Sequence, residues 1–140
     1  MQWTEDLSVG VEEIDTQHKE LFRRINSLVD AIRKAECKLV IDGVIKFLEE
    51  YAIMHFSEEE GYMKRYGYPE YLQHKTQHGI FMKSLSDLKE QAGLPRVQGR
   101  SYELSVTTNQ MVVDWIIVHI TRVDRKLGEF LKARNGFISP

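Results

Sequence analysis

Apolar residues recur every three or four positions over four long segments of this chain. The segments cover residues 15–36, 39–65, 70–92 and 101–134. This spacing gathers the apolar side chains on one face of an α-helix, and no competing strand or hairpin pattern is found. Gly67 and Pro69 mark the break after the second segment, and Gly93 and Pro95 mark the break after the third. We therefore expect four helices, the first of them capped by Asp15.

Short connections make successive helices pack antiparallel, so the four segments predict an all-α fold, an up-down-up-down four-helix bundle. The 140 residues are enough for one domain to bury a core without added cross-links. We expect a single domain over residues 1–140, with an N-terminal arm over residues 1–14 and the bundle over residues 15–134.

The composition is that of an ordinary soluble domain, with 42% hydrophobic and 29% charged residues. A net charge of −2 gives no reason to expect binding to nucleic acid or to an anionic membrane. The first residues lack a signal-peptide pattern, and no apolar run approaches the roughly 20 residues of a membrane span. We therefore expect a cytoplasmic protein without membrane insertion. The single Cys37 excludes an intramolecular disulfide and a cysteine-rich zinc site, and we assign it no role.

All five histidines of the sequence fall on the apolar faces of the expected helices. They are His18, His55, His74, His78 and His119. A single histidine at such a position is usually a core residue with one local hydrogen bond. A buried imidazole that lacks partners costs about 1–3 kcal/mol, and a shared metal ion satisfies several imidazoles at once. Because no histidine lies on a polar face or in a loop, the five together indicate one shared purpose.

The histidines lie early in the first and third segments and late in the second and fourth, so antiparallel packing brings them to one level of the bundle. Glu59 follows His55 by one turn on the same apolar face. A carboxylate is rarely tolerated there unless it is paired or binds a metal. Its neighbours Glu58 and Glu60 lie off this face, and we expect them to be solvated.

Asp124 follows His119 by five residues, in the stretch HITRVD. Five steps of a regular α-helix turn a side chain about 140° away from the starting direction. Asp124 is therefore either a surface residue, or the helix has a π-type widening between the two, a feature that tends to occur at functional sites. The same segment is expected to place Met111 and Trp115 on its apolar face.

The number and type of these donors select the metal. Five nitrogens and two carboxylates are too many for one tetrahedral zinc ion, whereas imidazole and carboxylate together suit six-coordinate iron. If two octahedral ions share both carboxylates and one oxo or hydroxo bridge, eleven of their twelve positions are filled. The one open position would bind one small molecule.

His18 and three stretches, HFSEE from residue 55, HKTQH from residue 74 and HITRVD from residue 119, form one pattern. This pattern resembles the ligand set of the hemerythrin family, and the length of the chain is similar to that of its stand-alone bacterial members. The resemblance implies two iron ions, Fe²⁺ or Fe³⁺, joined by an oxo or hydroxo bridge. It assigns His74, His78 and His119 to one iron, His18 and His55 to the other, and Glu59 and Asp124 to both as bridges.

The resemblance also implies reversible dioxygen binding at the iron that has two histidines, for oxygen storage, delivery or sensing. Apolar residues next to the ligands are expected to line the oxygen pocket. These residues are Leu21, Phe22, Trp115, Ile116 and Ile120. None of them offers an acid or a base to cleave an oxygen–oxygen bond, so we do not expect an enzyme. A protein partner for oxygen delivery or signalling stays unknown from the sequence.

Two alternatives stay open at this point. A di-iron oxidase, a peroxidase or a nitric-oxide-handling enzyme would use a related centre. Di-iron enzymes of the ferritin-like class, however, use paired Glu-x-x-His motifs, and the sequence contains none. A sensor would pass the state of the iron to a partner, and we find no pattern of a signalling module within these 140 residues.

Overall fold

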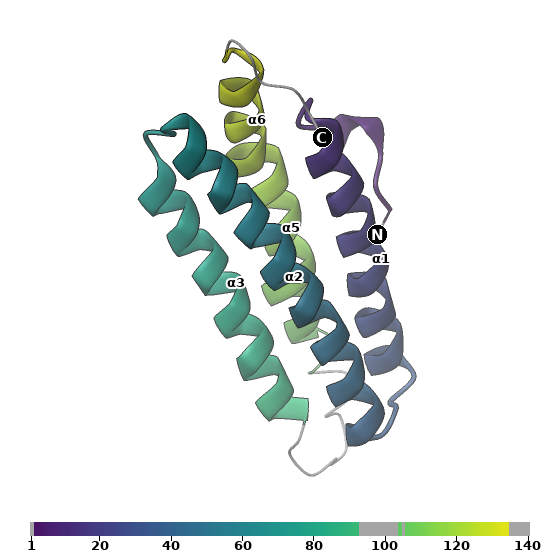
Figure 1. Cartoon of the computed structure of the whole chain (residues 1–140). Helices are drawn as coiled ribbons and strands as arrows, with labels where there is room; N and C mark the ends of the chain where they lie inside the picture. Colours follow the sequence, from purple (N-terminus) through teal and green to yellow (C-terminus); the bar gives the residue numbers. More distant parts are fainter. Residues whose placement is uncertain (1, 93–103, 105, 135–140) are drawn as a thin grey trace.

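The computed structural model describes residues 2–92, 104 and 106–134 of the chain. Within these residues all regular structure is helical: three long helices are followed by a fourth helical rod made of consecutive segments (Figure 1). The first elements are the short 3₁₀-helix η1 (Glu5–Leu7), α1 (Glu12–Arg33), α2 (Lys38–Tyr66) and α3 (Tyr71–Ala92). The rod contains η2 (Asn109–Asp114), α5 (Trp115–Val118), η3 (His119–Asp124) and α6 (Arg125–Lys132).

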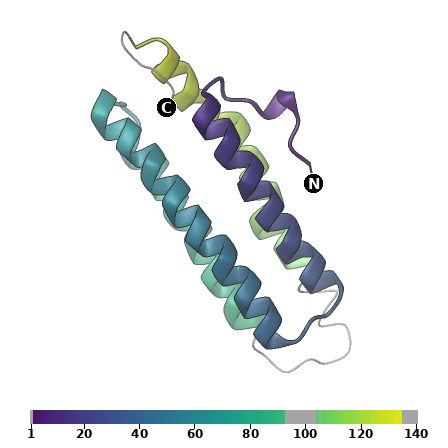
Figure 2. The same cartoon turned by 45° about the vertical axis from the view of Figure 1, so that its right-hand side comes forward.

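The four long helices run alternately up and down, as Figures 1 and 2 show. Residues 34–37 connect α1 to α2, and residues 67–70 connect α2 to α3. Connections this short force neighbouring helices to pack antiparallel, and α2 packs against both α1 and α3. The predicted fold, an all-α antiparallel four-helix bundle with an N-terminal arm, is confirmed. None of the described helices is both long enough and apolar enough to cross a membrane.

One half of the bundle has an almost entirely apolar core. Its buried side chains include Ile25, Leu28 and Ile32 of α1, Ile41, Ile45 and Leu48 of α2, and Phe81, Leu85 and Leu88 of α3. Each fully buried side chain of this kind contributes about 1.5–3 kcal/mol to folding. Nearly all buried polar residues lie in the other half, so the apolar half supplies the stability that a polar cluster elsewhere requires.

A glycine-based turn ends α2 and sets the start of α3 beside it. Gly67 adopts a left-handed φ of 70°, a conformation that costs glycine little because it has no Cβ. The backbone N–H of Tyr68 then donates to the carbonyl oxygen of Met63 at 2.8 Å. This confirms the break predicted from Gly67 and Pro69. The break predicted from Gly93 and Pro95 lies outside the described residues, as do residues 101–103 of the predicted fourth segment.

The prediction that Asp15 caps the first helix is wrong, because α1 begins at Glu12. Asp15 lies inside the first turn of the helix. Its carboxylate accepts hydrogen bonds from the backbone N–H of Val9 at 2.9 Å and from the hydroxyl of Ser8 at 2.5 Å. The side chain therefore ties the N-terminal arm, residues 2–11, to α1 instead of starting the helix.

The arm packs closely on α6 and turns back beside α1 (Figure 2). A Cβ atom placed on Gly128 would lie 2.1 Å from the carbonyl oxygen of Val9, so only a glycine permits this approach. Val9 and Val11 are buried. Farther along the arm, the ammonium of Lys19 lies 4.5 Å from the centre of the Trp3 ring. The arm is thus fixed at the end of the bundle where α1 starts and α6 ends.

Candidate metal centre

All five histidines lie in the interior of the bundle at one level, together with Glu59 and Asp124. Each of these seven residues exposes 3% of its surface or less. They come from every long helix: His18 from α1, His55 and Glu59 from α2, His74 and His78 from α3, and His119 and Asp124 from the two ends of η3. The ring centres of His18 and His55 are 4.8 Å apart, and those of His74 and His119 are 5.0 Å apart. The predicted convergence is confirmed.

The seven side chains form two groups that share both carboxylates. One group contains His74, His78 and His119 with Glu59 and Asp124, and the other contains His18 and His55 with the same Glu59 and Asp124. Within each group the candidate ligand atoms lie within 4.8 Å of one another. Two groups joined by common carboxylates form the arrangement that a pair of adjacent metal ions requires.

The fourth helix widens into a π-helix over His119–Asp124, which confirms the widening considered from the five-residue spacing. A π-turn takes one residue more than an α-turn, so side chains five positions apart share a face. Nε2 of His119 and Oδ1 of Asp124 are therefore 3.1 Å apart, and both residues are buried. The hydroxyl of Thr121 donates to the carbonyl oxygen of Ile117 at 2.8 Å within this region. The alternative that Asp124 lies on the surface is wrong.

A second π-helix, η2, is not indicated by the sequence pattern and shifts the core-facing residues by one position. The expected apolar face contains Met111 and Trp115, but the structure fully buries Val112 and Ile116 and leaves Met111 and Trp115 partly buried. The additional residue in the widened turn accounts for the shift. Because apolar residues stand at both sets of positions, the sequence fits either register.

The buried ligand atoms have no hydrogen-bond partner within the described part of the structure. They are Nε2 of all five histidines and both carboxylate oxygens of Glu59 and of Asp124. Nε2 of His74 lies 3.0 Å from Oδ1 of Asp124, and Nε2 of His78 lies 3.2 Å from Oε1 of Glu59. Neighbouring ligands of an octahedral ion with metal–ligand distances of ~2.1 Å are separated by roughly 3.0 Å. The donor set therefore fits two metal ions, which would satisfy atoms that are otherwise costly to bury.

The environment also keeps both carboxylates ionised. Burial raises the pKa of Glu59, but the surrounding imidazoles outweigh it and lower this pKa to about 2. Burial acts in the same way on Asp124, yet His119 and its neighbours hold the Asp124 pKa well below its usual value. Burial lowers the pKa of His74, but the two carboxylates raise it to about 10. A metal ion bound here would therefore displace a proton from His74.

Two polar residues that sequence reasoning missed hold the outer nitrogens of two histidines. Nδ1 of His78 is 2.9 Å from a carboxylate oxygen of Glu60, and Nδ1 of His55 is 2.6 Å from the side-chain oxygen of Gln17. Glu58 in turn accepts a hydrogen bond from the amide of Gln17. Glu58 is exposed, as predicted, and also bonds to Gln17, whereas Glu60 is only partly exposed and faces His78. The only signal within one helix is the four-residue spacing of Glu13 and Gln17, which lets their side chains bond to each other. This spacing does not show that Gln17 also contacts a histidine on another helix.

Four of the five residues expected to line an oxygen pocket are fully buried beside the ligands. They are Leu21, Phe22, Ile116 and Ile120. Trp115 is partly buried and stacks on the His119 ring, with centres 4.5 Å apart and planes 12° from parallel. Phe56, which the sequence did not single out, stacks on the His78 ring at 3.9 Å and 8°. Two of the imidazoles are thus fixed in orientation by aromatic faces, in apolar surroundings.

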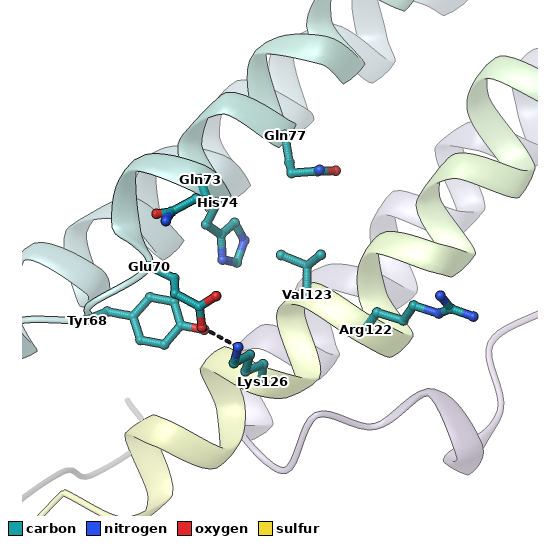
Figure 3. A pocket seen from close by; sticks show the side chains of 8 residues that line it. All are labelled: Tyr68, Glu70, Gln73, His74, Gln77, Arg122, Val123 and Lys126. Atoms are coloured by element: carbon teal, nitrogen blue, oxygen red, sulfur yellow. Dashed lines mark ion pairs between the residues drawn. The ribbon is translucent and has the colours of Figure 1, made fainter.

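A surface pocket of about 230 Å³ lies behind His74, between α3 and the end of the fourth helix (Figure 3). It is lined by Tyr68, Glu70, Gln73, His74, Gln77, Arg122, Val123 and Lys126. Glu70 and Lys126 form an ion pair across it. Burial raises the pKa of Tyr68 to about 12, so this hydroxyl stays neutral. His74 thus lies between this surface pocket and the buried cluster.

The buried histidines and carboxylates inside a four-helix bundle place this chain in the class of helical-bundle domains with a candidate metal site. The chain belongs to the hemerythrin family, because the family model described as hemerythrin HHE cation binding domain matches residues 9–131. The resemblance noted from the motifs is confirmed.

Similar proteins cover almost the whole chain. The bacteriohemerythrin of Methylococcus capsulatus is 30% identical over 137 residues, which cover 95% of this chain and 98% of that protein. The myohemerythrin of Theromyzon tessulatum is 29% identical over 125 residues, which cover 89% of this chain and 88% of that protein. A crystal structure of wild-type hemerythrin superposes with a TM-score of 0.79 at 31% identity, covering 95% of this chain and 98% of that one.

Proposed function

We propose that this protein binds dioxygen reversibly at a non-haem di-iron centre, for oxygen storage, delivery or sensing. The observation that carries the proposal is the pair of buried groups, one with three histidines and one with two, that share Glu59 and Asp124. Membership of the hemerythrin family supports iron as the metal.

The ligand assignment follows the two groups. His74, His78 and His119 would hold one iron, His18 and His55 would hold the other, and Glu59 and Asp124 would bridge both. With one oxo or hydroxo bridge, the three-histidine iron reaches six ligands and the two-histidine iron reaches five. Dioxygen would bind at the remaining position, and two ferrous ions held by these residues would supply the electrons for this binding.

The surrounding side chains favour release of unchanged dioxygen. Leu21, Phe22, Ile116 and Ile120 are buried and apolar, so they exclude water from the surroundings of the cluster. General acid catalysis requires a titratable group within hydrogen-bond reach of the reacting atom, and these four side chains offer none. We infer that the protein is a carrier and not an enzyme.

Absorption spectra recorded while the reduced protein is cycled between air and argon test this function. We expect a visible charge-transfer band that appears under air, disappears under argon, and returns over several rounds with slow drift toward the oxidised form. Irreversible oxidation at the first exposure, with stoichiometric release of hydrogen peroxide, would show a di-iron oxidase instead.

A further inference from the structure

Two of the five imidazoles have a protein partner at the outer nitrogen, and these partners differ in charge. In the three-histidine group, Nδ1 of His78 faces the carboxylate of Glu60 at 2.9 Å. In the two-histidine group, Nδ1 of His55 faces the neutral amide of Gln17 at 2.6 Å. The Nδ1 atoms of the other three histidines are buried without a partner in the described part of the structure. Each group thus has one outer partner.

The orientation of Gln17 is fixed by two carboxylates on its far side. Its NH₂ group donates to Glu13 at 3.2 Å and to Glu58. Only the side-chain oxygen is then left to face His55, which must donate its Nδ1–H to it. Nε2 of His55 is therefore the free nitrogen, and it points into the cluster beside Glu59 at 3.5 Å.

The orientation of His78 is fixed in a similar way. The ring stacks on Phe56 at 3.9 Å, its Nδ1 faces Glu60, and its Nε2 lies 3.2 Å from Glu59 in the cluster. An ionised acceptor draws the Nδ1 proton more strongly than an amide does, because charge-assisted hydrogen bonds are about twice as strong as neutral ones. This leaves Nε2 of His78 the better electron donor.

We propose that Glu60 and Gln17 are positioning residues that make the two irons unequal, the carboxylate stabilising the ferric state of the three-histidine iron and the amide leaving the two-histidine iron without that stabilisation. The proposal rests on the proposed di-iron centre. It assigns a redox role to two residues outside the ligand set, each acting through the imidazole that it contacts.

The midpoint potential of the iron-loaded protein, measured by titration with a chemical reductant, tests the role of Glu60. Glu60→Gln keeps the shape and an acceptor oxygen but removes the charge. We expect this variant to keep two irons per chain. Its potential should be higher by ~59 mV for one electron, which is a tenfold shift of the equilibrium toward the ferrous state. Glu50→Gln is the matched control, since Glu50 is an exposed acid on the same helix, about 15 Å farther along it. It should leave the potential unchanged.

A second variant moves a carboxylate to the other group without changing the net charge. Gln17→Glu combined with Glu58→Gln places a carboxylate beside Nδ1 of His55. The amide introduced at position 58 can donate a hydrogen bond to that carboxylate. We expect the potential to fall. A potential equal to or above that of the unmodified protein would contradict the role of Gln17.

Two results with Glu60→Gln would overturn the role of Glu60. One is a potential equal to that of Glu50→Gln. The other is loss of iron, because an amide still accepts the hydrogen bond and the charge would then serve assembly instead of tuning. These results are independent of the oxygen test. A shifted potential without reversible oxygen binding would contradict only the proposed function, and reversible oxygen binding without a shift would contradict only this inference.

Discussion

His78 contacts the candidate centre through one ring nitrogen and its outer partner through the other. Replacing it with alanine removes one of three nitrogens from its group and leaves the carboxylate of Glu59 with one donor fewer in a buried site. We expect His78→Ala to lose at least one of the two irons, measured by metal analysis of the purified protein. Gln77→Ala, its neighbour on the pocket side, should keep both. Two irons per chain in His78→Ala would contradict the assignment.

The sequence was informative about individual residues wherever the chemistry of a side chain conflicted with its position. The five histidines and Glu59 stand on apolar faces, and that conflict marks them without a structure. Gln17 and Glu60 lie just off those faces, where polar residues are ordinary. Their contacts with His55 and His78 depend on the rotation of a neighbouring helix, which the periodicity of one segment does not determine.

At the scale of elements, the contact between the N-terminal arm and α6 depends on Gly128. A Cβ there would meet the carbonyl oxygen of Val9 at 2.1 Å, so the arm must move. We expect Gly128→Ala to lower the free energy of unfolding by about 1–3 kcal/mol, measured by denaturant titration.

Gly79→Ala is the matched control, because nothing lies within 4 Å of a Cβ at that exposed position of α3. An alanine inside a helix is favoured over glycine by roughly 0.5–1 kcal/mol, so this variant should be more stable than the unmodified protein. Equal stability of the two variants would show that the arm is not held against α6.

The helices themselves could be predicted to different degrees. Regular 3.6-residue periodicity gave α1, α2 and α3 within a few residues. The largest differences are in α1, which starts and ends three residues before the predicted 15–36; its start differs because Asp15 bonds to the arm. The five-residue step between His119 and Asp124 left two alternatives, a surface aspartate or a widened helix, and the structure has the widening. No such pair of fixed side chains brackets η2, so the apolar pattern alone did not separate Met111 from Val112 as the buried residue.

At the scale of the whole molecule, stability of the metal-free protein should be greatest near pH 6.5. The His74 pKa is raised to about 10, so its contribution is complete below the ordinary value of 6.5 and is lost as pH rises toward 10. Burial lowers the pKa of His55 to about 4. Below pH 6.5 the unfolded chain therefore binds a proton that the folded chain does not, and stability falls as pH falls toward 4.

Iron should remove the alkaline part of this profile, because a metal-bound His74 carries no proton at Nε2 to lose. We expect thermal unfolding temperatures that fall between pH 7 and 9 without iron and stay level with it, and that are higher with iron throughout. Parallel profiles for the two forms would contradict binding of iron to His74.

We propose that five histidines and two shared carboxylates hold two irons with one position open to dioxygen. Gas uptake by the fully reduced protein, measured against its iron content, tests this claim most directly. We predict uptake of one dioxygen for every two irons and its recovery as dioxygen under argon. Uptake without recovery, or no uptake by protein that contains two ferrous irons, would contradict it.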